Sequence, residues 1–312
     1  MNFQNNEAMR EANPNLNAVT GGVSFSAATV IYIFVSLAVG IIINLSAIET
    51  GSDAFVYLSY IAAPLALAPA VFGVMTFRKI KFREAFPLKC HTKYYLIAVL
   101  LIFGLLFSLG WVNDVTIMFF KLFGYVPRTQ ESYFPDITGW KIIPAFIVIA
   151  VLPAIFEEAL FRGLLLNSTE NGVGSIRAIF IVGFCFSLFH GSPEQTVYQF
   201  ISGCVFAFVA VRSRSIMPSV LMHFINNGLL VILYACGAFS EDGSSLVLSQ
   251  SGNITLICVS AACFVGGFVW LILDKTALKK TVPGEVKNFF IFASVGILLL
   301  AVIWISNLFG VG

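Results

Sequence analysis

Charged side chains are scarce in this sequence. Lys, Arg, Asp and Glu make up 11% of the 312 residues, whereas soluble domains carry about 25%. Hydrophobic residues make up 58%, and apolar runs of about 18 or more residues recur, each long enough to cross a hydrocarbon layer of about 30 Å. This balance excludes a soluble globular protein. It predicts an all-α, polytopic transmembrane helical bundle.

Cysteine and histidine are also sparse. The six cysteines stand singly, five of them in apolar runs and none at metal-binding or redox spacing, so we expect small apolar packing residues. No His-Glu-x-x-His zinc motif occurs among the three histidines. Residues 1–22 carry only Arg10 as a basic residue and lack the short apolar core of a secretion signal. We therefore expect a polar N-terminal tail over residues 1–22, with the first span retained.

The apolar runs predict eight or nine spans in a single transmembrane domain over residues 23–312. They lie near residues 23–45, 54–77, 94–112, 141–166, 176–190, 195–211, 216–237, 254–273 and 288–309. An outer connection with a short amphipathic piece at residues 116–123 follows the third span, and a polar loop is expected after Leu166.

Basic residues mark one end of the predicted spans. Six of them crowd into the connection between the second and third spans, and others fall between the sixth and seventh and between the eighth and ninth (Arg78, Lys79, Lys81, Arg83, Lys89, Lys93; Arg212, Arg214; Lys275, Lys279, Lys280, Lys287). Because short basic loops stay in the cytoplasm, we predict a multi-pass protein of the cell membrane with a cytoplasmic N-terminus.

The most informative charges lie inside the fourth span, in Phe156-Glu157-Glu158-Ala159-Leu160-Phe161-Arg162. One charge at the centre of a span costs about 3 kcal/mol on insertion scales, so three such groups need partners. Glu158 and Arg162 are four residues apart and can neutralise each other on one helix face. Glu157 points about 100° away on an α-helix of 3.6 residues per turn. Pro153 should distort this helix, since it cannot donate to the carbonyl of Ile149.

Two later spans carry the polar side chains that could serve as partners. His190 ends the fifth span, one helical turn after Phe186, and His223 lies one turn before Asn227 in the seventh. At 1.5 Å per residue all of them, with Glu157, fall about 12–21 Å from the predicted cytoplasmic ends. Taken singly, a histidine or asparagine within the membrane often forms a hydrogen bond between helices. The charges of the fourth span could likewise form a purely structural ion pair. Taken together, they predict one polar site within the membrane.

These three motifs resemble the signature of the CAAX-protease and bacteriocin-processing (Abi, CPBP) membrane protease family, which includes Rce1-type prenyl-protein endopeptidases. The resemblance covers Glu157-Glu158-x-x-x-Arg162, Phe186-x-x-x-His190 and His223-x-x-x-Asn227, within residues 140–235. It implies a glutamate-dependent intramembrane endopeptidase with a conical buried catalytic cavity.

Carried over by the resemblance, Glu157 and His190 would position and deprotonate a water. His223 and Asn227 would form the oxyanion hole, and Glu158, Arg162 and Phe186 would support the site. No cofactor is implied. The expected partners are the lipid bilayer and a membrane-associated peptide or protein, with no nucleic acid. A peptide or leader peptide is favoured over a prenylated CAAX tail, because short loops are typical of bacterial chains and many bacteria lack prenylation.

Three alternatives stay open. Two histidines and two glutamates could bind zinc in a metal-dependent membrane protease, although Arg162 would repel a dication. Acids within the membrane also relay ions in transporters and channels. A non-catalytic immunity or scaffold protein would use the same fold for binding alone.

Overall fold

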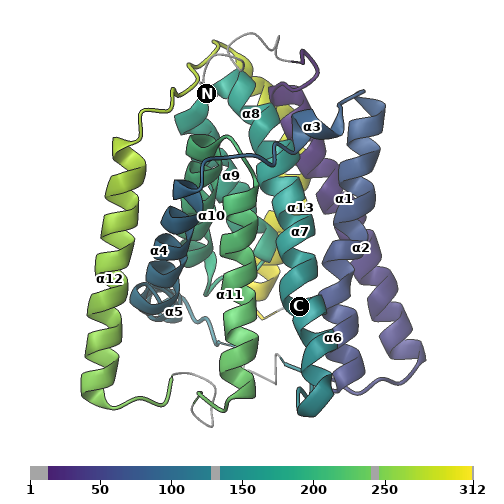
Figure 1. Ribbon diagram of the computed structural model, residues 1–312. Helices are drawn as coiled ribbons and strands as arrows, with labels where there is room; N and C mark the ends of the chain where they lie inside the picture. Colours follow the sequence, from purple (N-terminus) through teal and green to yellow (C-terminus); the bar gives the residue numbers. More distant parts are fainter. Residues whose placement is uncertain (1–12, 128–133, 240–245, 311–312) are drawn as a thin grey trace.

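The protein is a bundle of helices (Figure 1). The computed structural model describes residues 13–127, 134–239 and 246–310, and within these ranges it holds no β-strand beyond one isolated bridge. The helices are α1 (Ala18–Leu45), α2 (Asp53–Phe77), α3 (Phe82–Ala85), α4 (Lys93–Ser108), α5 (Trp111–Lys121), α6 (Ile142–Phe146), α7 (Leu152–Glu158), α8 (Leu166–Val173), α9 (Ser175–His190), α10 (Thr196–Ser213), α11 (Met217–Ala235), α12 (Gln250–Leu273) and α13 (Glu285–Leu308). The predicted all-α fold is confirmed.

The lengths of these helices support a polytopic membrane protein. Within the described residues, seven helices are long and apolar enough to span a membrane, and α4 with α5 makes an eighth if this pair, bent by 44°, forms one span. Eight is the lower of the two predicted counts. The predicted fifth span is present as α9, which at 16 residues is shorter than an ordinary span.

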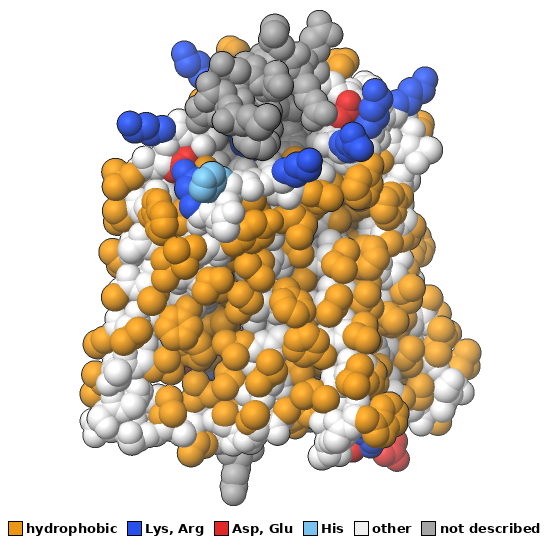
Figure 2. Space-filling view, viewed as in Figure 1, with side chains coloured by type: hydrophobic (Ala, Val, Ile, Leu, Met, Phe, Trp, Pro, Cys, Tyr) orange, Lys and Arg blue, Asp and Glu red, His pale blue; other side chains and the backbone are white. Residues whose placement is uncertain are grey.

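The molecular surface also supports a polytopic membrane protein. A broad band of hydrophobic side chains covers the middle of the molecule in Figure 2, as expected for a face that meets lipid. Lys and Arg gather at the end where Figure 1 places α3 and the connection between α12 and α13. The loops predicted to be cytoplasmic thus share one end of the bundle. Which side of the membrane this end faces stays a prediction.

Two helix boundaries differ from the prediction. The first helix begins at Ala18 rather than residue 23, because the side chain of Asn17 caps it by accepting from the N–H of Thr20, and Gly21 and Gly22 pack against α8 and α13. The polar residues expected as a loop after Leu166 form α8 instead. The side chains of Asn167 and Asn171 donate to backbone carbonyls of Ala85 and Leu16, and the helix ends at Gly174, whose φ of 82° suits glycine. Residues 1–12 lie outside the described ranges, so the division into tail and domain stays a prediction.

An ion pair closes the basic end between α4 and the residue after α12. Lys93 Nζ lies 2.5 Å from Asp274 Oδ2, and only 2% of the Asp274 side chain is exposed. Burial raises the pKa of Asp274, but hydrogen bonds, above all from Lys93, outweigh that effect and lower the pKa to about 2.

Asp274 should therefore stabilise the fold in a pH-dependent way. A carboxyl whose pKa is lower in the folded state stabilises that state above its unfolded pKa of about 4, and the effect is lost as pH falls towards 2. We expect Asp274→Asn to lower stability by about 1 kcal/mol at pH 7, as for a partly solvated ion pair. The difference from wild type should disappear near pH 2. Thermal melting in detergent at a series of pH values measures it, and a pH-independent difference would contradict the prediction.

Candidate active site

A single long helix carries the two glutamates and the arginine. It runs from Gly139 to Val173 as η1 (Gly139–Lys141), α6, η2 (Ile147–Val151), α7, η3 (Ala159–Leu165) and α8. The segments η2 and η3 are π-helical turns, which are frequent at functional sites.

The first π-helical turn has an identifiable cause. Pro153 follows η2 and has no N–H to donate to the carbonyl of Ile149. That carbonyl instead accepts a hydrogen bond of 2.9 Å from Nδ2 of Asn227 on α11. The predicted distortion at Pro153 is therefore a π-helical turn whose freed carbonyl bonds a polar residue of a neighbouring helix.

Glu158 and Arg162 form the predicted ion pair. Arg162 Nη1 lies 2.8 Å from Glu158 Oε1, and neither side chain is exposed. The guanidinium also donates to the carbonyl of Gly203, at 3.2 Å, and lies 4.5 Å from the ring centre of Phe186 and 5.0 Å from that of Phe206. Two aromatic faces and a carbonyl thus add to the stabilisation of a charge that burial would otherwise make costly.

His223 connects the two glutamates. Its Nδ1 donates to Glu158 Oε1 over 2.9 Å, and its Nε2 lies 4.0 Å from Glu157 Oε2. The second distance is too long for a hydrogen bond but suits a bridging water or substrate atom. Glu157 Oε2 is itself buried and has no hydrogen-bond partner within the described residues. Glu157 Oε2 and His223 Nε2 therefore lie close to each other, and both can still form a hydrogen bond to a molecule between them.

His190 is oriented by its own helix. Its Nδ1 lies 2.8 Å from the carbonyl oxygen of Phe186. Because a carbonyl can only accept, Nδ1 carries the hydrogen, and Nε2 of the neutral ring keeps its lone pair. The imidazole packs on the Phe186 ring with 4.6 Å between centres.

Asn227 occupies the same helix as His223. Its Nδ2 is committed to Ile149, and its Oδ1 accepts a bond of 2.9 Å from Asn226. Asn226 therefore orients Asn227. The second amide hydrogen of Asn227 has no partner among the residues that the structure describes.

Exposure divides the site residues into two groups. Glu158 and Arg162 are not exposed at all, whereas 7% of the His223 side chain and 14% of the Glu157 side chain are exposed, Asn227 is half-buried and His190 is exposed. Groups that meet water or substrate must be accessible, and groups that only hold others in place need not be. A conical cavity around them stays a prediction.

One contribution was not foreseen from the sequence. Phe206 and Gly203 lie on α10, which packs closely on α9 because Gly183 and Gly203 face each other. An apolar helix with no charged residue at membrane depth gives no signal of its own. The sequence indicated only that Arg162 needs further partners, and it did not show that α10 provides them.

The described residues contain no group of three or more His, Cys, Asp or Glu side chains arranged to hold a metal ion. Glu158 already binds Arg162 and His223. The zinc alternative is tested below by experiment.

A comparison with protein families bears on the three motifs together. The family model for type II CAAX prenyl endopeptidase Rce1-like proteins matches residues 139–229. This segment is Rce1-like. It begins with η1 and ends two residues after Asn227, so it contains every candidate site residue. The predicted resemblance is confirmed, and it implies a membrane protease. Comparisons with curated proteins and with solved structures give no match.

Proposed function

We propose that this chain is an intramembrane glutamic endopeptidase. The observation that carries the proposal is the pair formed by Glu157 and His223. Glu157 is an accessible carboxylate whose Oε2 has no partner within the described residues, and it faces Nε2 of His223 across 4.0 Å. The charge of Glu158 is by contrast taken up by Arg162. One acid is thereby left to react and the other to hold the site together.

In the proposed reaction, Glu157 and His190 act on a water between them. The Nε2 lone pair of His190 and the Glu157 carboxylate orient the water, and Glu157 accepts its proton as the oxygen attacks the peptide carbonyl carbon. The same proton then passes to the leaving nitrogen as the C–N bond breaks. The products are a carboxylic acid and an amine.

His223 and Asn227 are proposed to stabilise the oxyanion. If His223 is an imidazolium, the buried cluster of Glu157, Glu158, Arg162 and His223 has no net charge, which favours burial. Nδ1–H then donates to Glu158, and Nε2–H is free to donate to the developing oxyanion. Donors placed in this way are worth about 3 kcal/mol each in comparable enzymes. The remaining amide hydrogen of Asn227 would be the second donor.

The proposed substrate is a membrane-associated peptide or protein, with a leader peptide favoured over a prenylated tail. The proposed location is the cell membrane, with the N-terminus in the cytoplasm. The test compares peptides released by membranes with wild-type protein and with Glu157→Ala. We expect a set of peptides that only the wild type releases. Identical peptide pools would reject proteolysis, and loss of a substrate-dependent ion flux in Glu157→Gln liposomes would favour transport.

Hydrolysis is expected to persist in chelator-treated, metal-free protein. The reason is that Arg162 and His223 already bind Glu158, and the cation of Arg162 opposes a dication. The measurement is the rate of release of one peptide identified above, before and after chelation. Loss of hydrolysis that zinc alone restores would reject the glutamic mechanism.

A further inference from the structure

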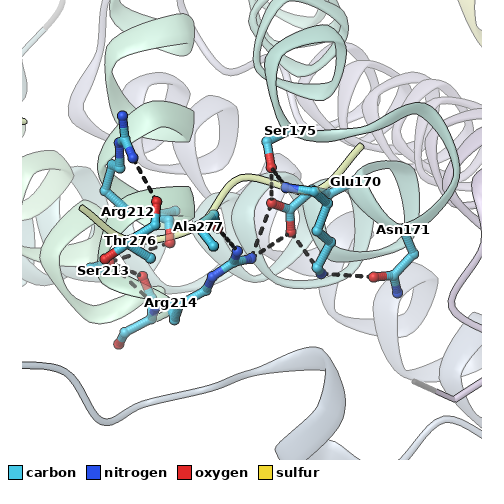
Figure 3. A network of polar contacts seen from close by, with 11 residues as sticks. Glu170, Asn171, Ser175, Arg212, Ser213, Arg214, Thr276 and Ala277 are labelled. Atoms are coloured by element: carbon cyan, nitrogen blue, oxygen red, sulfur yellow. Dashed lines mark hydrogen bonds and ion pairs between the residues drawn. The ribbon is translucent and has the colours of Figure 1, made fainter. Parts of the chain in front are cut away.

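A second buried carboxylate lies at the basic end of the bundle (Figure 3). Glu170 is 2% exposed. Ser175 Oγ donates to its Oε1 over 2.5 Å, Arg214 Nη1 lies 3.1 Å from both of its oxygens, and Lys279 Nζ lies 2.9 Å from Oε2. The carboxylate is therefore held by a hydroxyl and two cations.

These partners stand at the ends of the helices that build the candidate site. Glu170 lies on α8, at the end of the long helix that carries Glu157. Ser175 is the first residue of α9, whose last residue is His190. Arg214 lies in the turn before α11, which carries His223 and Asn227. One carboxylate thus connects the basic ends of the three helices with the motif residues.

The connection between α12 and α13 reinforces this cluster. Arg214 Nη2 donates to the carbonyl of Ala277, and Lys279 Nζ donates to Asn171 Oδ1 over 2.8 Å. The backbone of Lys279 also bonds Ser175 in both directions, N–H to Oγ at 2.8 Å and carbonyl to N–H at 3.1 Å. Figure 3 shows Arg214 pointing towards Glu170 and Ala277. The connection therefore closes over the three helix ends.

We propose that Glu170 is a positioning residue for the reaction at Glu157. This inference rests on the proposed function. Thirteen residues of helix separate the two glutamates, about 20 Å at 1.5 Å per residue, so Glu170 acts only through the helices that it joins. A small turn or slide of one helix end shifts Glu157, His190 and His223 relative to one another. A misplacement of about 1 Å can cost about 100-fold in rate.

The Lys93–Asp274 pair offers a matched control. It lies at the same end of the bundle, and its acid is as well buried as Glu170. It joins α4 to the residue after α12, and neither helix carries a motif residue. Glu170→Gln and Asp274→Asn therefore remove comparable charges, but only the first disconnects the helices of the candidate site.

The test uses the full-length protein in proteoliposomes and a peptide identified by comparison with Glu157→Ala. Rates are normalised to the folded fraction and measured well below the melting temperature of each variant. We expect Glu170→Gln to lower kcat by about 10- to 100-fold with little change in KM, and Glu170→Asp to recover part of the loss. Asp274→Asn should keep the wild-type kcat. Equal kcat values for Glu170→Gln and Asp274→Asn would overturn the proposal.

Arg214→Lys is the milder second variant, should Glu170→Gln fail to fold. It keeps the charge but loses the forked geometry by which Nη1 contacts Glu170 while Nη2 contacts the carbonyl of Ala277. We expect Arg214→Lys to lower kcat with little change in KM. A wild-type kcat for Arg214→Lys would also overturn the proposal. If Glu157→Ala itself keeps full activity, the proposed function fails instead.

Discussion

Glu157→Gln is expected to lower kcat by about 10³- to 10⁴-fold while the protein stays folded. General acid–base groups contribute about 10²- to 10⁴-fold, and we place Glu157 at the upper end because it is proposed to take the proton of the water in the first step and to give it to the leaving nitrogen in the second. The substitution keeps the size of the side chain and removes only its charge and basicity. Single-turnover release of an identified peptide from proteoliposomes measures the rate without a contribution from product release.

Glu285→Gln is the matched control for this prediction. It makes the same chemical change at the first residue of α13, at the basic end of the bundle. It should keep wild-type kcat and KM. A Glu157→Gln protein that retains more than about a tenth of the wild-type kcat would contradict the role of Glu157 as the base. If Glu157→Gln keeps its activity and Glu158→Gln loses it, then Glu158 rather than Glu157 is the base.

Arg162→Met is expected to cause the largest loss of stability. The substitution leaves the carboxylate of Glu158 fully buried with only His223 as a charged partner. Breaking a buried ion pair from one side typically costs about 3–5 kcal/mol. Denaturant-induced unfolding in detergent micelles measures the change. Lys141→Met breaks an exposed pair with Asp136 and should leave the unfolding curve almost unchanged.

The double variant Glu158→Gln/Arg162→Met separates charge from packing. It removes both buried charges and keeps an oxygen that can accept from Nδ1 of His223. We expect it to recover most of the stability lost in Arg162→Met, while hydrolysis stays low because the charge that favours a protonated His223 is gone. A double variant no more stable than the single one would show that Arg162 stabilises the fold by packing on Phe186 and Phe206.

The sequence predicted those parts of the site that follow from the cost of burying charge. Glu158 and Arg162 are local in sequence, so their pairing follows from helix geometry alone. The meeting of Glu157 with His223 was predictable because polar groups at membrane depth need partners. The bond from His223 Nδ1 to Glu158 was not predictable, since it depends on how α11 is rotated against the long helix.

The remaining differences come from tertiary packing that apolar patterns do not encode. Hydropathy located the spans but not the extension of the long helix through α8, whose Asn167 and Asn171 find backbone carbonyls on neighbouring segments. The hydrogen bond from Asn227 to the carbonyl of Ile149 depends on Pro153, which frees that carbonyl, and on the position of α11 beside the long helix. The contribution of α10 carries no polar signal.

The π-helical turns on either side of α7 imply that this helix can lose one residue at such a turn without changing the direction of its other side chains. Each such turn holds one residue more than an α-helical turn, so it acts as a built-in insertion. Deleting one residue from η2 would therefore let this turn close into a regular α-helix, while the segments before and after it keep their relative rotation. Homologous sequences in which this turn is α-helical should align here with a one-residue gap.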